Sequence, residues 1–217
     1  MALPPAMPAW LIGASPALDA TCKSMNSYAG RDKATRTLAF MCALQAQRDP
    51  DHAKEWAALG KQCSSARLVF RQFNHPAMIK ALQGLWAKSP DDEIESICTW
   101  TTAVSYSIFG VVELGAWLAD AKIISGDAAK MFRICLYLWF IALLAGIVKQ
   151  LRVIVRKGFS QLDKIKDDAL LLLSYACDFL CAGNAMPAGL MWSGRLPSAL
   201  TVRLSLIASV IGLYRTL

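Results

Sequence analysis

"ICLYLWFIALLAGIV", residues Ile134 to Val148, is an unbroken apolar run in a sequence that elsewhere mixes charged and apolar residues. As a helix it would be about 22 Å long at roughly 1.5 Å per residue, whereas a bilayer core is roughly 30 Å thick. Apolar residues continue to Val155, and the long side chains of the flanking Arg133 and Lys149 can reach the membrane surface. We therefore predict a membrane-anchoring helix near residues 131–155. A buried helix of a soluble protein is the alternative.

The composition of the whole chain also indicates a membrane protein. Of its 217 residues, 55% are hydrophobic and 18% are charged, whereas about a quarter of the residues in an average soluble domain are charged. The net charge of +7 suits either nucleic acid or the anionic lipid of a cytosolic leaflet. Because the mean hydropathy is high, at +0.37, we expect an anionic phospholipid membrane as the partner, and no nucleic acid.

A second membrane anchor is expected near residues 196–214. Trp192 is typical of a membrane interface, Pro197 suits a first helical turn, and Arg203 lies near enough to the helix start to reach the surface. The same helix carries small residues three or four positions apart, which allow two helix backbones to approach closely. These candidate helix-packing residues are Ser205, Ala208, Ser209 and Gly212.

Two further apolar stretches each contain one acidic residue. Glu113 lies within Ile97–Ala119, and Asp178 lies within Ala169–Ala182. A charge in the middle of a bilayer costs about 3 kcal/mol or more, so such a residue can mark a transport pathway. More often it marks the polar side of a half-immersed helix. We favour the second interpretation, because neither residue has a basic partner one turn away and neither helix is long enough to span cleanly.

The N-terminal half predicts amphipathic helices. They are expected over Asp19–Gln47 and about His52–Trp86, with Pro50 ending the first and Pro76 kinking or breaking the second. Strand-like alternation is absent from the sequence, so we predict an all-α integral membrane protein with N-terminal amphipathic helices and two hydrophobic anchors. Its predicted parts are a flexible leader over residues 1–18, an amphipathic helical region over 19–90 and a membrane-embedded region over 91–217.

One amphipathic stretch, "SSARLVFRQF" at residues 64–73, sets two arginines four positions apart beside an apolar strip. Arg67, Arg71 and Lys80 lie at the border of the strip, which contains Phe70 and Phe73. The stretch fits a bundle helix with a solvated basic face. It also fits an interfacial helix whose aromatic side enters the acyl boundary while the arginines meet lipid phosphates.

Metal binding and catalysis are not expected. The seven cysteines are scattered and form no CxxC pair, so we interpret them as free thiols in a reducing compartment. His52 and His75 are the two histidines, and neither has a second ligand at helical spacing. The sequence offers no recognisable nucleophile, acid and base. We therefore predict a protein without cofactor or metal that is not an enzyme.

Several stretches in order along the chain resemble the peroxin-11 family, most closely its gamma or C type. They are "NSYAGRDKATRTLAF" (Asn26–Phe40), "SSARLVFRQF", the apolar run at Ile134–Val148, "GLMWSGRLP" and "IASVIGLYRTL". Together they cover nearly the full length. The residues of the opening motif are Tyr28, Gly30, Arg31, Asp32 and Arg36.

The resemblance implies an integral, multi-pass protein of the peroxisomal membrane, or of the glycosomal membrane in organisms with that specialised peroxisome. Such a protein elongates and divides the organelle without catalysing a reaction, and residues 19–90 would face the cytosol. The segment with Arg67, Phe70, Arg71, Phe73 and Lys80 would insert into one leaflet and bend it. The gamma type also resembles an adaptor. A small channel or metabolite transporter, with Glu113 and Asp178 facing a shared interior, is the alternative.

The resemblance also implies partners: other copies or members of the family, the fission machinery and an import receptor for peroxisomal membrane proteins. The N-terminus has no basic signal-peptide region, so the membrane address is expected to be internal. A basic cluster beside the apolar run is the candidate: Lys149, Arg152, Arg156 and Lys157. Alternatively, these charges only mark the end of the membrane helix.

Overall fold

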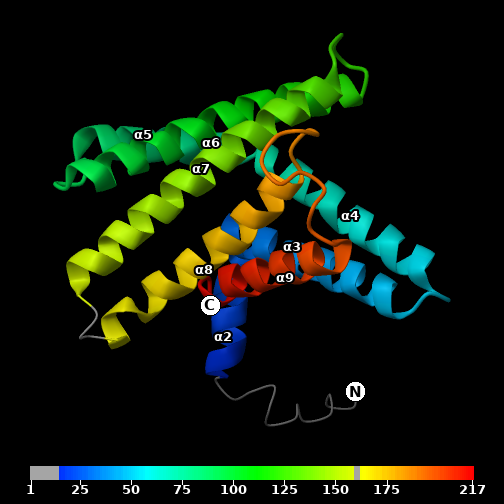
Figure 1. Cartoon of the computed structure of the whole chain (residues 1–217), viewed down its shortest axis with the longest axis horizontal. Helices are drawn as coiled ribbons and strands as arrows, with labels where there is room; N and C mark the ends of the chain where they lie inside the picture. Colours follow the sequence, from blue (N-terminus) through cyan, green and yellow to red (C-terminus); the bar gives the residue numbers. More distant parts are fainter. Residues whose placement is uncertain (1–14, 159–161) are drawn as a thin grey trace, which may run out of the picture.

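The computed structural model describes residues 15–158 and 162–217, and helices make up nearly all of this part of the chain (Figure 1). The described residues form no strand, so the predicted all-α fold is confirmed. Most of the predicted leader over 1–18 lies outside the described residues. The helices are α2 (Pro16–Asn26), α3 (Tyr28–Arg48), α4 (Ala53–Gln72), α5 (His75–Ala87), α6 (Glu93–Asp120), α7 (Ala128–Lys157), α8 (Leu162–Asn184) and α9 (Ser198–Tyr214).

Helices α6 and α7 form a long antiparallel hairpin, and within the described residues they are the two helices long and apolar enough to cross a membrane. Helix α6 has 28 residues and α7 has 30, so each exceeds the ~20 residues that a span requires. In their most apolar windows only 28% and 33% of the residues are buried inside the protein. Most residues in these windows are therefore at least partly exposed.

The expected anchor near 131–155 thus lies in α7, but the second candidate span is α6 and not the helix predicted over 196–214. Helix α9 has 17 residues, which is about 26 Å at roughly 1.5 Å per residue. Helix α6 is longer than the sequence indicated because the Asp92 side chain accepts a hydrogen bond from the Glu95 N–H at 3.0 Å and caps a first turn rich in acidic residues.

Helix α9 packs against α3 and α8, and α8 lies between it and α7 (Figure 1). Its small residues Ser205, Ala208 and Ser209 are buried, and the Ala208 carbonyl accepts a hydrogen bond from the Ser174 hydroxyl at 3.2 Å. Gly212 lies under the aliphatic stem of Lys33. The predicted small-residue face therefore joins helices of the same chain.

The junction of α7 and α8 holds an aromatic core. Phe140 and Phe179 stack with ring centroids 4.4 Å apart, and the Trp192 ring packs against both. The Trp192 indole N–H donates to the Leu180 carbonyl at 2.7 Å, and the ring covers Gly183 so closely that a Cβ there would overlap it. Trp192 therefore packs against the protein core, although the sequence suggested a membrane-interface residue.

The break between α2 and α3 explains why position 30 of the opening motif is a glycine. The Ser27 hydroxyl caps α3 by accepting from the Gly30 N–H at 2.9 Å, so the predicted single helix over Asp19–Gln47 is two helices. The turn brings the buried Ser24 onto Gly30. Ser24 also shares a hydrogen bond of 2.7 Å with the Thr216 hydroxyl, which attaches the C-terminal end.

Gly30→Ala should destabilise the protein, because the added Cβ would overlap the Ser24 carbonyl, which is backbone and cannot turn away. Overpacking of this kind costs about 1–3 kcal/mol. Gly84→Ala is the matched control, because nothing lies within 4 Å of its Cβ position in α5 and alanine favours a helix by up to ~1 kcal/mol. Thermal unfolding in detergent, followed by circular dichroism, should show a lower Tm for Gly30→Ala and a higher Tm for Gly84→Ala. Equal changes of Tm in the two variants would contradict this account.

Candidate functional site

The inner face of α4 carries two arginines that bind carboxylates on two other helices. Arg67 Nε donates to Asp32 Oδ1 of α3 at 2.9 Å. One turn later, Arg71 donates from Nε and Nη2 to the two carboxylate oxygens of Glu113 in α6, at 2.8 and 2.6 Å. Such two-point contacts fix both the orientation and the separation of the side chains. Helix α4 is therefore bound to α3 and to a candidate membrane span at the same time.

Helix α3 continues this pattern toward α8. One turn after Asp32, Arg36 donates from Nη1 and Nη2 to Asp178 at 2.9 and 2.5 Å. The side chains of Arg36 and Asp178 are each only 8% exposed. Burial alone would lower the pKa of Arg36, but the hydrogen bonds and charge of Asp178 outweigh it and raise that pKa. The guanidinium therefore stays charged in the interior.

These three pairs form one charged interior feature, which we call the ion-pair chain. It alternates in sign except where Arg67 and Arg71 adjoin on α4, and it links α8, α3, α4 and α6. Burying ions is costly, and removing one partner of a buried pair typically costs about 3–5 kcal/mol because the other is left without compensation. The residues of the ion-pair chain are Asp178, Arg36, Asp32, Arg67, Arg71 and Glu113.

The remaining residues of the opening motif lie close to the ion-pair chain. Tyr28 is partly buried, and burial together with the negative charge of Asp32 raises its pKa to about 12. Arg31 points outward and donates to the Met25 and Asn26 carbonyls at 3.2 and 3.4 Å. The motif therefore combines two ion-pair residues with the residues that shape and close the α2–α3 turn.

The sequence suggested that Glu113 and Asp178 mark the polar sides of half-immersed helices, but in the structure both are buried. Their residues are only 3% and 6% exposed. The basic partners lie 42 and 142 residues away in the sequence, so a search one helical turn away misses them. Each carboxylate is bound by its own arginine, and the partner comes from another helix in both cases.

The last turns of α4 and helix α5 expose large apolar side chains. Phe73 is 79% exposed and Trp86 is 83% exposed, and Val69, Phe70 and Ile79 are also exposed. We call these five residues the outer strip. The interfacial interpretation of residues 64–73 also has the aromatic residues facing outward. Neither interpretation described arginines that face inward to carboxylates. Contact of Arg67 and Arg71 with lipid phosphates stays a prediction.

The outer strip adjoins the candidate membrane spans. Helix α5 packs on α6, with His75 and Met78 against Gly110, and Trp86 meets Trp100 edge-to-face at 6.0 Å. Exposed apolar patches larger than a few hundred Å² are rare on soluble monomers and mark protein or membrane contacts. The large exposed apolar residues of α6 and α7 are Ile94, Ile97, Val104, Ile108, Val111, Ile134, Ile141, Leu144, Val148, Leu151 and Val155.

The basic cluster at the end of α7 is mostly paired. Arg152 Nη2 donates to Asp92 Oδ2 and Arg156 Nη1 donates to Glu95 Oε1, both at 2.8 Å, which ties the end of α7 to the start of α6. Lys157 binds Asp168 of α8 at 2.5 Å. Lys149 makes no ion pair within the described part of the chain. The cluster therefore closes the hairpin, and its use as an import-receptor address stays a prediction.

The thiols and carboxylates do not gather into a metal site. The seven cysteines are free, and five of them are buried. Among residues 15–158 and 162–217, no group of three His, Cys, Asp or Glu side chains is placed to hold a metal ion.

Comparison with known proteins places this arrangement among peroxisomal proteins. Residues 18–164 match the family of peroxisomal biogenesis factor 11 (PEX11). Peroxisomal membrane protein 11C of Homo sapiens is 24% identical over 226 residues, covering 91% of this chain and 93% of that protein. The protein of the same name from Mus musculus is 27% identical over 222 residues, covering 89% and 92%. No solved structure matches the chain.

A double-mutant cycle should measure the link between α4 and α6. Arg71→Met leaves the buried Glu113 carboxylate without its partner, so unfolding should become easier by about 3–5 kcal/mol. Arg71→Met combined with Glu113→Leu should recover most of that loss, because no charge then remains buried. Arg48→Met, at an exposed arginine at the end of α3, is the control. Glu113→Leu alone completes the cycle. If its loss and the loss of Arg71→Met simply add in the double variant, the pair does not couple the helices.

The Asp92–Arg152 pair should make stability depend on pH in the acid range. Hydrogen bonds from Arg152 and from the Glu95 backbone N–H lower the pKa of Asp92 from 3.8 to about 2. A lowered carboxyl pKa stabilises the folded state above the ordinary pKa, and this contribution disappears as the pH falls toward about 2. Unfolding of wild type and of Asp92→Asn, compared by circular dichroism from about pH 5 to about pH 2, should therefore converge. A constant difference would contradict the assignment.

Proposed function

The chain belongs to the PEX11 family of peroxisomal biogenesis factors, and we propose that it remodels the peroxisomal membrane by inserting its outer strip into one leaflet. The resemblance of the sequence to the C type of this family is confirmed, and a role at the peroxisomal membrane follows from it. Elongation and division of the organelle, and so control of its number and size, are the processes that we propose for it. The role needs no catalysis.

The observation that carries the proposal is the exposure of Phe73 and Trp86, at 79% and 83%. Fully burying a large apolar side chain contributes about 1.5–3 kcal/mol relative to leaving it in water. A lipid leaflet supplies that burial. An apolar strip that enters one leaflet to a depth of about 5–10 Å expands that leaflet alone. The membrane then curves toward the other leaflet.

The ion-pair chain gives Arg67 and Arg71 a different role from the one that the resemblance implies. Because both arginines bind carboxylates, they hold α4 with its apolar side outward instead of meeting lipid phosphates. Attraction to anionic lipid is then left to lysines on the outer surface, each worth about 1 kcal/mol near such a membrane. The exposed lysines of α4, α5 and the residue after α5 are Lys54, Lys61, Lys80 and Lys88.

We further propose that the α6–α7 hairpin crosses the membrane twice, which makes the protein an integral, multi-pass protein of the peroxisomal or glycosomal membrane. The polar outer surface at the start of α4 suits the cytosolic side, as expected for residues 19–90. Helix α5 lies along α6, so its apolar side chains reach lipid next to the span. Association with other family members and with the fission machinery belongs to the same proposal.

Phe73→Gln combined with Trp86→Gln should abolish membrane elongation while leaving the fold intact. The full-length protein is reconstituted into anionic liposomes, whose shapes are measured by electron microscopy. Each substitution removes up to about 2–3 kcal/mol of insertion free energy, so the double variant should insert more than about tenfold less. Substituting Arg67 or Arg71 would not test insertion alone, because the loss of an ion pair would also destabilise the fold.

Met41→Gln is the matched control, because Met41 is 53% exposed but lies on α3, away from the outer strip. It should elongate liposomes as wild type does, and circular dichroism should show unchanged helix content in all variants. If the Phe73 and Trp86 double variant elongates liposomes as well as wild type, insertion of the outer strip is not the mechanism.

A further inference from the structure

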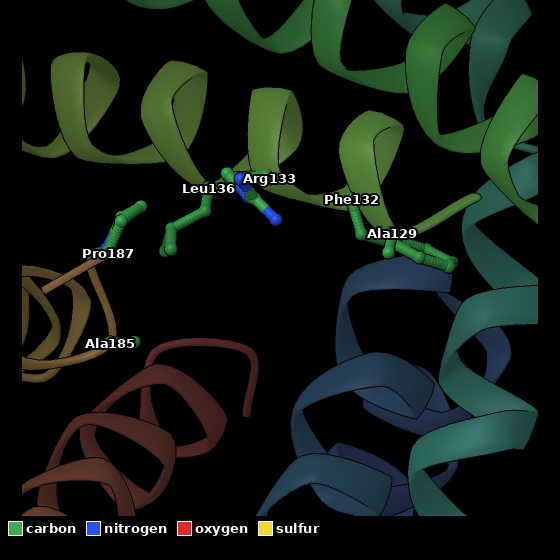
Figure 2. Close-up of a pocket in the computed structure, with 6 residues that line it drawn as sticks. All are labelled: Ala129, Phe132, Arg133, Leu136, Ala185 and Pro187. Atoms are coloured by element: carbon green, nitrogen blue, oxygen red, sulfur yellow. The ribbon is translucent and has the colours of Figure 1, made fainter. Parts of the chain in front are cut away.

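One arginine differs from those of the ion-pair chain. Arg133, near the start of α7, is exposed and makes no ion pair or side-chain hydrogen bond within the described part of the chain. Figure 2 shows its side chain beside Leu136, on the side of α7 that faces Ala185 and Pro187. These residues line a hollow of about 420 Å³, together with Ala129 and Phe132. Its size lies within the range of small-molecule sites, roughly 300–1,000 Å³.

The hollow has one charged side chain, and the other side chains that line it are apolar. No acidic side chain lines it, in contrast to Arg36, Arg67 and Arg71, whose guanidinium groups all face carboxylates. An arginine in such a setting is compensated best by an anion from outside the chain, and its planar fork matches the oxygens of a phosphate. The apolar walls favour a ligand that joins this phosphate to hydrocarbon.

The position of the hollow along α7 also fits such a ligand. Arg133 directly precedes the apolar run Ile134–Val148 and lies about 8 Å along the helix from Ala128. It is therefore placed where a membrane-spanning helix passes from the headgroup layer to the hydrocarbon layer. Leu136, one turn deeper, extends the wall in the direction that an acyl chain would take.

The opposite wall is held in place by hydrogen bonds within the segment that follows α8. The Ser193 hydroxyl donates to the Met186 carbonyl at 2.5 Å, the Gly194 N–H donates to the Asn184 carbonyl at 3.0 Å, and the Leu196 N–H donates to the Asn184 side chain at 2.8 Å. Met186 itself is buried in the aromatic core. The hollow is therefore formed before any ligand enters, which lowers the ordering cost of binding.

We propose that this hollow is a binding site for an anionic glycerophospholipid, with the phosphate on Arg133 and the start of an acyl chain along Phe132, Leu136 and Pro187. The site is separate from the outer strip, and the proposal does not require that strip to enter a leaflet. It gives α7 a bound lipid at one end of the hairpin, while the other end is closed by Arg152 and Arg156.

The test measures lipid binding to the purified full-length protein in detergent by native mass spectrometry. Three probes separate the sources of phosphate: dihexanoyl phosphatidic acid, zwitterionic dihexanoyl phosphatidylcholine and inorganic phosphate. We expect phosphatidic acid to bind best. Inorganic phosphate binding as tightly as phosphatidic acid would overturn the lipid assignment, because the apolar walls would then contribute nothing.

Four variants separate this site from general electrostatic attraction. Arg133→Gln should weaken phosphatidic acid binding by about five- to tenfold, and Arg133→Lys should retain most of it. Ala185→Leu, which narrows the hollow while keeping Arg133, should also weaken binding. Lys130→Gln is the matched control, because Lys130 is exposed one turn earlier on α7 and does not line the hollow. Equal losses in Lys130→Gln and Arg133→Gln, or no loss in Ala185→Leu, would overturn the proposal.

Discussion

A buried charge in a mostly apolar protein needs an opposite charge within hydrogen-bond reach, and the arrangement of this chain follows from that constraint. Glu113 and Asp178 interrupt otherwise apolar stretches of α6 and α8. Each is bound at two points by an arginine from another helix. Since an unpaired partner costs several kcal/mol, α4 must stay against α6 and α3 must stay against α8. The ion-pair chain therefore specifies which helices are neighbours, even where it adds little net stability.

The same constraint determines what the molecule presents outward. With the arginines of α4 turned inward, Phe73 and Trp86 are left on the surface. Apart from the buried Glu113, the hairpin likewise places its charged residues toward its ends and leaves its middle apolar. Polar pairs inside and apolar side chains outside reverse the pattern of a soluble helical bundle and suit lipid contact. Membrane remodelling by the outer strip would use this surface without breaking any ion pair.

The three arginines of the ion-pair chain and Arg133 have different surroundings. Those at 36, 67 and 71 are compensated within the fold and act in its architecture. Arg133 is exposed at a hollow that no carboxylate lines, where we propose that a lipid phosphate binds it. Residue type and helical spacing are the same in both groups. What differs is the neighbour across the helix interface, and that decides whether an arginine stabilises the fold or binds a ligand.

The sequence by itself determined the properties that depend on local pattern: the all-α class, the apolar helix around Ile134–Val148, and the helix breaks near Pro50 and Pro76. It also determined the family, because several short sequence motifs occur in the expected order. These follow because periodicity, proline geometry and hydropathy act within a few residues. Only the tertiary structure decided the partners of Glu113 and Asp178, the inward orientation of Arg67 and Arg71, and the identity of α6 as the second candidate span. Those features depend on contacts between residues up to 142 positions apart, and a helical repeat of 3.6 residues carries no information about which other helix lies across the interface.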